Sequence, residues 1–228
     1  MNTQSSKSII LSRTNYGESD RVLRVITEDG NKVALMAKGV RKLKSKMAGG
    51  IELFCECNLV YLGSKDRMGT LVSARVDTQY ANIVKDMERT MFGYEILKLV
   101  NKVTEDDQIA DYYRLLSVTL SAINSLDLDL NMIIVWTYYN LLEITGHRPN
   151  FLLDTSGEKL KEGNRYDFDI PTMSMVETSS GQYNSGHIKF LRVVERTGKP
   201  TALSRISGAE QIASDLADLF SKMIKFNL

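Results

Sequence analysis

Hydrophobic and polar residues alternate in short runs along the first 80 positions, a pattern that is typical of β-strands. Turn residues separate these runs, and the Asp29-Gly30 pair between the second and third runs signals a hairpin. Five short strands in about 80 residues suit a small closed barrel such as the OB-fold. The pattern predicts strands at residues 8–13, 21–27, 32–38, 54–62 and 70–76.

After residue 80 the apolar positions recur at the spacing of amphipathic helices. Three helices are predicted before Gly146, which suits a helix C-cap, and two more near residues 185–197 and 207–226. Residues 146–185 lose the helical period and gain Gly, Asn, Ser, Asp and Thr, which predicts an irregular or β-hairpin insert. The predicted core positions include Ile83, Met87, Met91, Tyr94 and Leu97 in the first helix, and Ile212, Leu216, Leu219, Phe220, Met223 and Phe226 in the last.

The predicted fold class is therefore α+β. An N-terminal five-stranded OB-fold barrel, expected to bind nucleic acid, occupies residues 1–80, and a helical domain at residues 81–228 carries the insert. No run approaches the roughly 18 apolar residues that a membrane span needs, and the N-terminus MNTQSSKS lacks the apolar core of a secretion signal. We expect a cytoplasmic protein with no membrane partner.

The small net charge of +1 hides an uneven distribution. Residues 1–80 carry 13 basic and 8 acidic side chains, residues 81–162 carry 8 and 13, and residues 163–228 carry 8 and 7. A basic first third beside an acidic middle indicates one surface that faces a polyanion, since a generally basic protein would show no such asymmetry.

The densest positive charge lies between Asn31 and Ile51, where six residues are basic and none is acidic. Lys and Arg neutralise phosphates, and these contacts dominate sequence-independent affinity for nucleic acid. Flanking glycines let the backbone bend closely around a partner. The segment predicts a nucleic-acid-binding loop, with a merely solvated basic loop as the alternative. The candidate residues are Lys32, Lys38, Arg41, Lys42, Lys44 and Lys46, and Arg13, Arg21, Arg24, Lys65, Arg67 and Arg75 could extend the track.

Residues for catalysis or metal binding are scarce. His147 and His187 are the only histidines, and neither has the spacing of a metal site; we expect His147 at a helix end and His187 exposed at a helix start. Cys55 and Cys57 are expected to be two small apolar side chains within the barrel. No phosphate-binding loop of the Gly-x-x-x-x-Gly-Lys type and no Gly-x-Ser-x-Gly motif occurs. We therefore expect no enzymatic activity and no cofactor.

Several motifs of the first 76 residues resemble the RecO family of DNA repair and recombination proteins. The stretch from Arg13 to Leu23, RTNYGESDRVL, is similar to the opening motif of that family. Thr27, Gly30 and Lys32 follow in the family's order, as do the segment AKGVR at residues 37–41 and Ser45. A Leu53-Phe54 pair and a strand containing Leu59 and Leu62 come next. The rest of the chain resembles the family only in layout.

The resemblance implies a mediator that binds single- and double-stranded DNA, anneals complementary strands and helps RecA to replace single-strand-binding protein. RecR and the acidic, hydrophobic C-terminal tail of single-strand-binding protein would be the partners, with RecA engaged indirectly and the protein associated with the nucleoid. The resemblance places Lys38 and Arg41 in the DNA-facing motif. Lys42, Lys44 and Lys46 join them on electrostatic grounds alone.

The chain departs from the family at one point. Many members carry two pairs of cysteines after the third helix and bind zinc there, whereas residues 151–185 contain no cysteine. Because thiolates are then not available as ligands, we expect a zinc-free hairpin. Turns should hold it, together with the packing of Phe151, Leu152, Leu153, Tyr166 and Phe168.

Two other functions stay open from the sequence. The acidic middle and the large helical part are also compatible with a protein-interaction scaffold that barely contacts DNA, with a groove that takes a partner's terminal peptide. An RNA-binding OB-fold protein is equally compatible with the basic segment, because nothing in the sequence separates ribose from deoxyribose.

Overall fold

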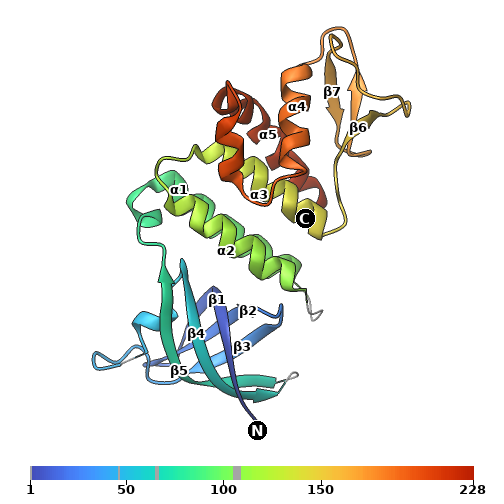
Figure 1. The fold of residues 1–228 in the computed structure, drawn as a ribbon. Coiled ribbons are helices and arrows are strands. Elements are labelled where there is room, and N and C mark those ends of the chain that lie inside the picture. The colour runs from blue at the N-terminus through green and yellow to red at the C-terminus, as the bar shows by residue number, and fades with distance from the viewer. Residues whose placement is uncertain (1, 46, 65–66, 105–108) are drawn as a thin grey trace. The chain divides into compact units, whose positions relative to one another are not determined.

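The computed structural model describes residues 2–45, 47–64, 67–104 and 109–228, and it divides the chain into two compact units. Unit 1 comprises Met1–Asn124 and unit 2 comprises Ser125–Leu228. Unit 1 consists of a β-barrel with helices α1 and α2, and unit 2 consists of helices α3, α4 and α5 with a small sheet (Figure 1). The barrel strands end at Gln79, and the two helices that follow them belong to the same compact unit as the barrel.

The barrel of unit 1 closes in the strand order β1-β2-β3-β5-β4. Neighbouring strands are antiparallel, except that β3 and β5 run parallel. A short 3-10 helix, Gly49–Ile51, lies in the connection between β3 and β4. The closed five-stranded barrel, with helices after it in the chain, confirms the predicted fold class. The strands are β1 (Asn2–Tyr16), β2 (Asp20–Thr27), β3 (Lys32–Ala37), β4 (Cys55–Ser64) and β5 (Arg67–Gln79).

The interior of the barrel is filled by alternate residues of its strands, as the period of a strand requires. Val40 and Ile51 from the connection between β3 and β4 complete this core. Cys55 and Cys57 are buried in it with their Sγ atoms 3.2 Å apart, which confirms their prediction as small interior side chains. The strand residues of the core are Ile10, Leu23, Val25, Leu35, Ala37, Cys55, Cys57, Leu59, Tyr61 and Leu71.

Helices α1 (Met87–Val103) and α2 (Ala110–Asn124) complete unit 1 after the 3-10 turn Ile83–Lys85. Helix α1 begins after Asp86, whose side chain accepts a hydrogen bond from the backbone N–H of Arg89 at 2.9 Å. The predicted core positions Met87, Met91 and Tyr94 are wrong, because all three are exposed, Met87 by 80%. The pattern that began at Ile83 ran across this helix start; the buried face consists of Arg89, Phe92, Gly93, Ile96, Leu97 and Val100.

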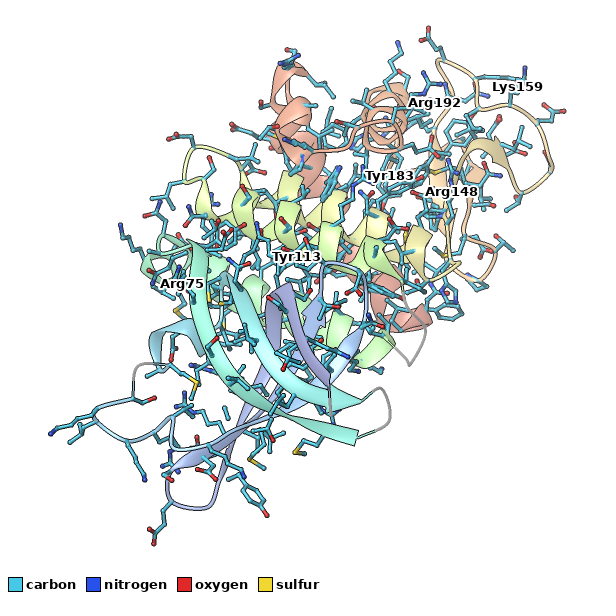
Figure 2. All side chains as sticks on the ribbon, turned by 60° about the horizontal axis from the view of Figure 1, so that its bottom comes forward. Arg75, Tyr113, Arg148, Lys159, Tyr183 and Arg192 are labelled. Carbon is cyan, nitrogen blue, oxygen red and sulfur yellow. The ribbon has the colours of Figure 1, made fainter. Side chains whose placement is uncertain are left out.

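A buried carboxylate of β4 joins α2 to the barrel. The Oε1 atom of Glu56 accepts hydrogen bonds from the hydroxyls of Tyr80 and Ser117, both at 2.6 Å. Its Oε2 atom accepts one from the Tyr113 hydroxyl at 3.0 Å and forms an ion pair with Lys7 at 2.7 Å. Figure 2 labels Tyr113 on α2. Burial acts to raise the pKa of Glu56, but the hydrogen bonds from these four groups together lower it below its ordinary value.

Two residues of the β2–β3 hairpin region also fix the helices of unit 1. The ammonium of Lys32 donates to the backbone oxygens of Asn101 at 2.6 Å and Thr104 at 2.8 Å, where the last carbonyls of α1 lack helical partners. Gly30 has a φ of +86°, and a Cβ there would lie 2.4 Å from the backbone nitrogen of Ala110. Only glycine therefore allows the hairpin turn to approach the start of α2 so closely.

Unit 2 contains α3, a small sheet and two further α-helices. In the sheet, β8 pairs parallel with β6 and antiparallel with β7. The strands are ordered β6-β8-β7, so the predicted irregular or hairpin insert is a sheet. The indole Nε1 of Trp136 on α3 donates to the backbone oxygen of Thr197 at 2.9 Å. The elements are α3 (Leu130–Ile144), β6 (Asn150–Asp154), β7 (Tyr166–Asp169), β8 (Ser174–Glu177), α4 (Ser185–Val194), a 3-10 helix (Pro200–Arg205) and α5 (Ala209–Asn227).

Packing in unit 2 follows the predictions in part. Phe151 and Tyr166 are buried as predicted, and the Phe151 ring lies 6.1 Å from that of Phe168. The prediction for Leu152 and Leu153 is wrong, because both are exposed on β6. In α5 the predicted core residues are buried or half-buried except Phe226, which is exposed. Across the ranges that the structure describes, no helix is long and apolar enough to cross a membrane.

Candidate nucleic-acid interface

The pairing register sorts the residues of β1, β2 and β3 into an inner and an outer set. Residues that lie directly opposite one another in an antiparallel pair point to the same side of the sheet. Leu23 is in the core, so its partners Arg13 and Leu35 share the inner side. Arg24 is the next residue and therefore points outward, together with its partners Ser12 and Ala34. Arg24 is exposed, as this position requires.

These outward residues form a continuous surface, here called the outer face. Near the helices it ends at Ile26, which is buried, and at the other end it reaches Tyr16 and Asp20. The small side chains on both sides of Arg24 leave its guanidinium open to solvent. The outer face comprises Ser12, Thr14, Tyr16, Asp20, Val22, Arg24, Ala34 and Met36.

The connection after β3, residues 38–48, is here called the basic loop; residue 46 lies outside the described residues. In Figure 1 this loop projects from the barrel. Its start is fixed in place: Val40 is buried in the barrel core, and Gly39 adopts a φ of +66°. The backbone N–H of Gly39 donates to the Asp20 carboxylate at 2.7 Å, and that of Arg41 donates to the Ser19 oxygen at 2.9 Å. The two motifs that carry the family resemblance therefore meet at this point.

Four cations of the basic loop are exposed: Lys38, Arg41, Lys42 and Lys44. Between the described residues, no ion pair of these four is present. The Arg41 guanidinium donates to the backbone oxygen of Gly17 at 3.1 Å, which holds its charge beside the β1–β2 turn. The predicted Lys46, and the flanking Lys65, lie outside the described residues.

Asp20 is an acidic residue whose carboxylate contacts the start of the basic loop. The hydrogen bond from the Gly39 N–H, followed by that from the Ser19 hydroxyl and the charges of Lys38 and Lys42, lowers the pKa of Asp20. The Asp20 carboxylate therefore stays charged while it fixes the loop to the first residue of β2. It neutralises only part of the positive field, because the loop carries four described cations.

Arg13 and Arg21 lie on the inner side, at the mouth of the barrel. Arg13 forms an ion pair with Glu52, and Arg21 lies 3.8 Å from the same carboxylate. The Nε of Arg21 also donates to the Asn15 side chain at 3.2 Å. Both arginines are half-buried. The structure therefore separates them from the outer face, although both were predicted to extend the same track.

Lys32 and Arg75 also lie apart from the basic loop. Lys32 is occupied by the carbonyls at the end of α1. Arg75 is exposed on β5, opposite Asn58 of β4, which is itself opposite Lys7 of β1 (Figure 2). Of the predicted cations, Lys38, Arg41, Lys42 and Lys44 lie in the one loop, and Arg24 lies exposed on the outer face.

Sequence reasoning missed the residues that shape this surface. Asp20 and Ser19 were read only as part of a motif, and their role in holding the loop follows from contacts between distant segments. Tyr16 and Val22 were not placed on this face, because outward apolar residues do not stand out in an alternating pattern. For Val22, the spacing of two from Arg24 is the signal that could have placed it there.

The insert of unit 2 was predicted to lack a zinc site because residues 151–185 contain no cysteine. Both cysteines are in β4, and the Asp154 Oδ1 atom already accepts from the backbone N–H groups of Ser156 at 2.9 Å and Glu158 at 3.0 Å. In the described parts of the chain, no group of three or more His, Cys, Asp or Glu residues could hold a metal ion. The zinc-free insert stays a prediction that a metal analysis of the purified protein would test.

His187 departs from its prediction. It lies at the start of α4 as predicted, but it is only 7% exposed. Its Nδ1 atom lies 3.3 Å from the backbone nitrogen of Asn184 and completes a capping box. Its Nε2 atom lies 3.2 Å from the Asp215 carboxylate on α5. The ring therefore joins two helices, which explains its burial.

Comparison with known proteins agrees with the motifs. Residues 1–80 match the family described as "Recombination protein O N terminal". The chain is 32% identical over 147 residues to the DNA repair protein RecO of Exiguobacterium sp., covering 64% of this chain and 58% of that protein. The proteins of the same name from Acetivibrio thermocellus and Listeria monocytogenes are each 31% identical, over 123 and 119 residues, covering 48% and 46% of their lengths. The chain thus spans about half the length of these curated relatives.

Proposed function

We propose that this chain is a DNA repair and recombination mediator of the RecO family without catalytic activity, because its first 80 residues match the N-terminal family and 147 of its residues align at 32% identity with a RecO protein. It binds single- and double-stranded DNA in the cytoplasm and anneals complementary strands. It also assists RecA loading together with RecR and the C-terminal tail of single-strand-binding protein. The observation that carries the proposal is the basic loop, whose four exposed cations sit on an anchored base beside the outer face.

The chemistry of the surface favours the DNA backbone over the base sequence. Lys38, Lys42 and Lys44 are flexible point charges that bind phosphates without reading bases. Arg24 stands alone among small neighbours, so it can bind a further phosphate along the outer face. A strand that is held by its phosphates keeps the pairing edges of its bases free, and this is the condition for annealing to a second strand.

A titration of single-stranded DNA at several salt concentrations tests the loop. The double variant Lys42→Ala/Lys44→Ala should weaken binding of every sequence about equally and lower the slope of log K against log salt by about 0.7 per lost contact. The control variant is Lys225→Ala, which removes an exposed lysine of α5 in unit 2. An unchanged slope in the double variant, or an equal loss in the control, would reject the basic loop as the binding site.

Strand annealing is tested separately with two complementary labelled strands. Wild-type protein should accelerate pairing, and the double variant should do so less at equal protein concentration. Matched RNA strands in the same assay decide between DNA and RNA as the ligand, because no described group of the outer face selects for a ribose hydroxyl. A preference for RNA, or no acceleration with either, would contradict the proposal.

A further inference from the structure

The tip of the basic loop carries an apolar side chain that is fully exposed. Leu43 has a relative exposure of 107%, and the exposed Lys42 and Lys44 stand directly beside it. Single exposed leucines are common on protein surfaces, so exposure alone indicates nothing. The position of this leucine, between two cations at the tip of an anchored loop, is what gives the exposure a chemical meaning.

The contacts at the base of the loop present this tip in a defined direction. Val40, three residues before the leucine, is buried in the barrel core. The Gly39 and Arg41 N–H groups donate to Asp20 and Ser19, and the Ser45 N–H donates to the Lys42 oxygen at 2.9 Å, which closes a turn around the leucine. Because the loop is held on both sides of Leu43, inserting this side chain into a ligand orders few additional residues.

We propose that Leu43 inserts between neighbouring bases of single-stranded DNA while the lysines beside it bind the flanking phosphates. This inference rests on the proposed DNA binding by the basic loop and adds a residue that distinguishes unpaired from paired DNA. Leucine is among the apolar side chains that proteins wedge between base steps. In a duplex the wedge must break stacking that both strands share, whereas in a single strand the bases separate more readily, so unpaired DNA is the favoured ligand.

A lipid surface is the other partner that a leucine between lysines suggests, and the structure favours it less. Interfacial binding to membranes needs an apolar face of several side chains together with cations. Here one fully exposed leucine stands among four described cations of the loop. Of the apolar residues on the adjoining outer face, Tyr16 is exposed, whereas Val22 and Met36 are half-buried and lie beside Arg24. This ratio of charge to apolar surface matches a phosphate backbone with one base step.

The test uses a single-stranded oligonucleotide with a central 2-aminopurine, whose fluorescence rises when the base is unstacked. Wild-type protein should raise the fluorescence. Leu43→Ala should abolish that rise at saturating protein, weaken binding about tenfold and leave the salt slope unchanged, because no phosphate contact is lost. Leu152→Ala, an equally conservative change at a leucine that is 50% exposed on β6, is the control and should behave as wild type. Circular dichroism should show that both variants fold.

The outcomes separate this inference from the proposed function. If Lys42→Ala/Lys44→Ala lowers the salt slope but Leu43→Ala binds and unstacks like wild type, the wedge is refuted while the basic loop stands. If neither variant changes binding, DNA binding by the basic loop is refuted, and the inference that rests on it is refuted with it. Vesicles of phosphatidylcholine and phosphatidylglycerol provide the last comparison: loss of vesicle binding in Leu43→Ala with unchanged DNA binding would overturn the inference in favour of a membrane surface.

Discussion

The carboxylate of Glu56 gives the sharpest stability prediction for unit 1. It is buried, and its two oxygens accept hydrogen bonds from Tyr80, Ser117 and Tyr113 and pair with Lys7. The substitution Glu56→Gln keeps the shape of the side chain but turns one acceptor oxygen into a donor. If the amide oxygen takes the place of Oε1, the amide NH₂ faces the Lys7 ammonium, and the charge-assisted bond is lost.

The expected cost follows from the bonds that change. A hydrogen bond to a charged group contributes about 1.5–3 kcal/mol, and those to Tyr80 and Ser117 survive in weaker, neutral form. Lys7 keeps a second partner, Asp77, at 2.8 Å, so its charge is not stranded. We therefore expect Glu56→Gln to lower the free energy of unfolding by about 2–3 kcal/mol. Asp77→Asn, at the more exposed partner of the same lysine, should destabilise unit 1 less than Glu56→Gln does, because solvent screens an exposed ion pair.

The effect should depend on pH with a defined sign. The pKa of Glu56 is lower in the folded protein than its ordinary value of 4.5, so the network stabilises the fold fully above the unfolded pKa. That stability is lost as the pH falls through the lower, folded pKa. Wild type and Glu56→Gln should therefore differ most at neutral pH and converge below 4.5, because protonation removes the same charge in the wild type.

The measurement must report on unit 1. Trp136, the single tryptophan of the chain, lies in unit 2, so its fluorescence follows the other unit. Urea unfolding followed by far-UV circular dichroism gives the free energy, and hydrogen exchange at residues 110–124 reports on α2 itself. Equal stability of wild type and Glu56→Gln at neutral pH, or a difference that persists in acid, would refute the role of the carboxylate.

Three further substitutions test other contacts. Lys32→Met should lower the free energy of unfolding by about 1–2 kcal/mol, because it frees the last carbonyls of α1, while the salt slope of DNA binding stays unchanged. Gly50→Ala should lower the thermal midpoint, because the new Cβ would lie 2.6 Å from a backbone oxygen of β5, whereas Gly49→Ala meets nothing within 4 Å and should leave it unchanged. His187→Ala should cost about 1–2 kcal/mol in unit 2, read from Trp136 fluorescence, and an unchanged midpoint would show that the ring is dispensable.

The barrel was predictable because a strand with one buried side must alternate. All five predicted runs lie within or nearly within observed strands. Their ends were not predictable in the same way: β1 begins at Asn2, six residues before the predicted start, and its polar residues there pair with β4. Backbone pairing needs no apolar side chain, so such extensions leave no hydrophobic pattern.

One local feature decides which face of α1 is buried, and another decides on which side of the barrel wall Arg13 lies. The N-cap at Asp86 breaks the apolar spacing that runs from Ile83 into the helix, so Met87, Met91 and Tyr94 point to solvent. In β1 a register shift between Ile10 and Ser12 changes which later residues face inward, and this places Arg13 on the inner side. A bulge is set by the pairing of two strands, and no side chain of one strand alone announces it.

The basic loop is the part of the candidate site that the sequence alone could locate, because charge density does not depend on register. Its presentation was not predictable, since the Asp20 and Ser19 contacts join segments about 20 residues apart. The same holds for Lys32, whose charge belongs to the predicted cluster but is used by α1. Whether a cation serves the fold or a ligand is decided by neighbours that only folding brings near.

The carboxylate shared between β4 and α2 also limits how the chain can be dissected. A fragment that stops at residue 80 would keep Glu56 but lack Tyr113 and Ser117. Its ionised carboxylate would then lose two hydrogen-bond donors. Transplanting the barrel into another protein would meet the same difficulty. The shortest fragment expected to fold alone therefore runs to Asn124, because α1 and α2 belong to the same compact unit as the barrel.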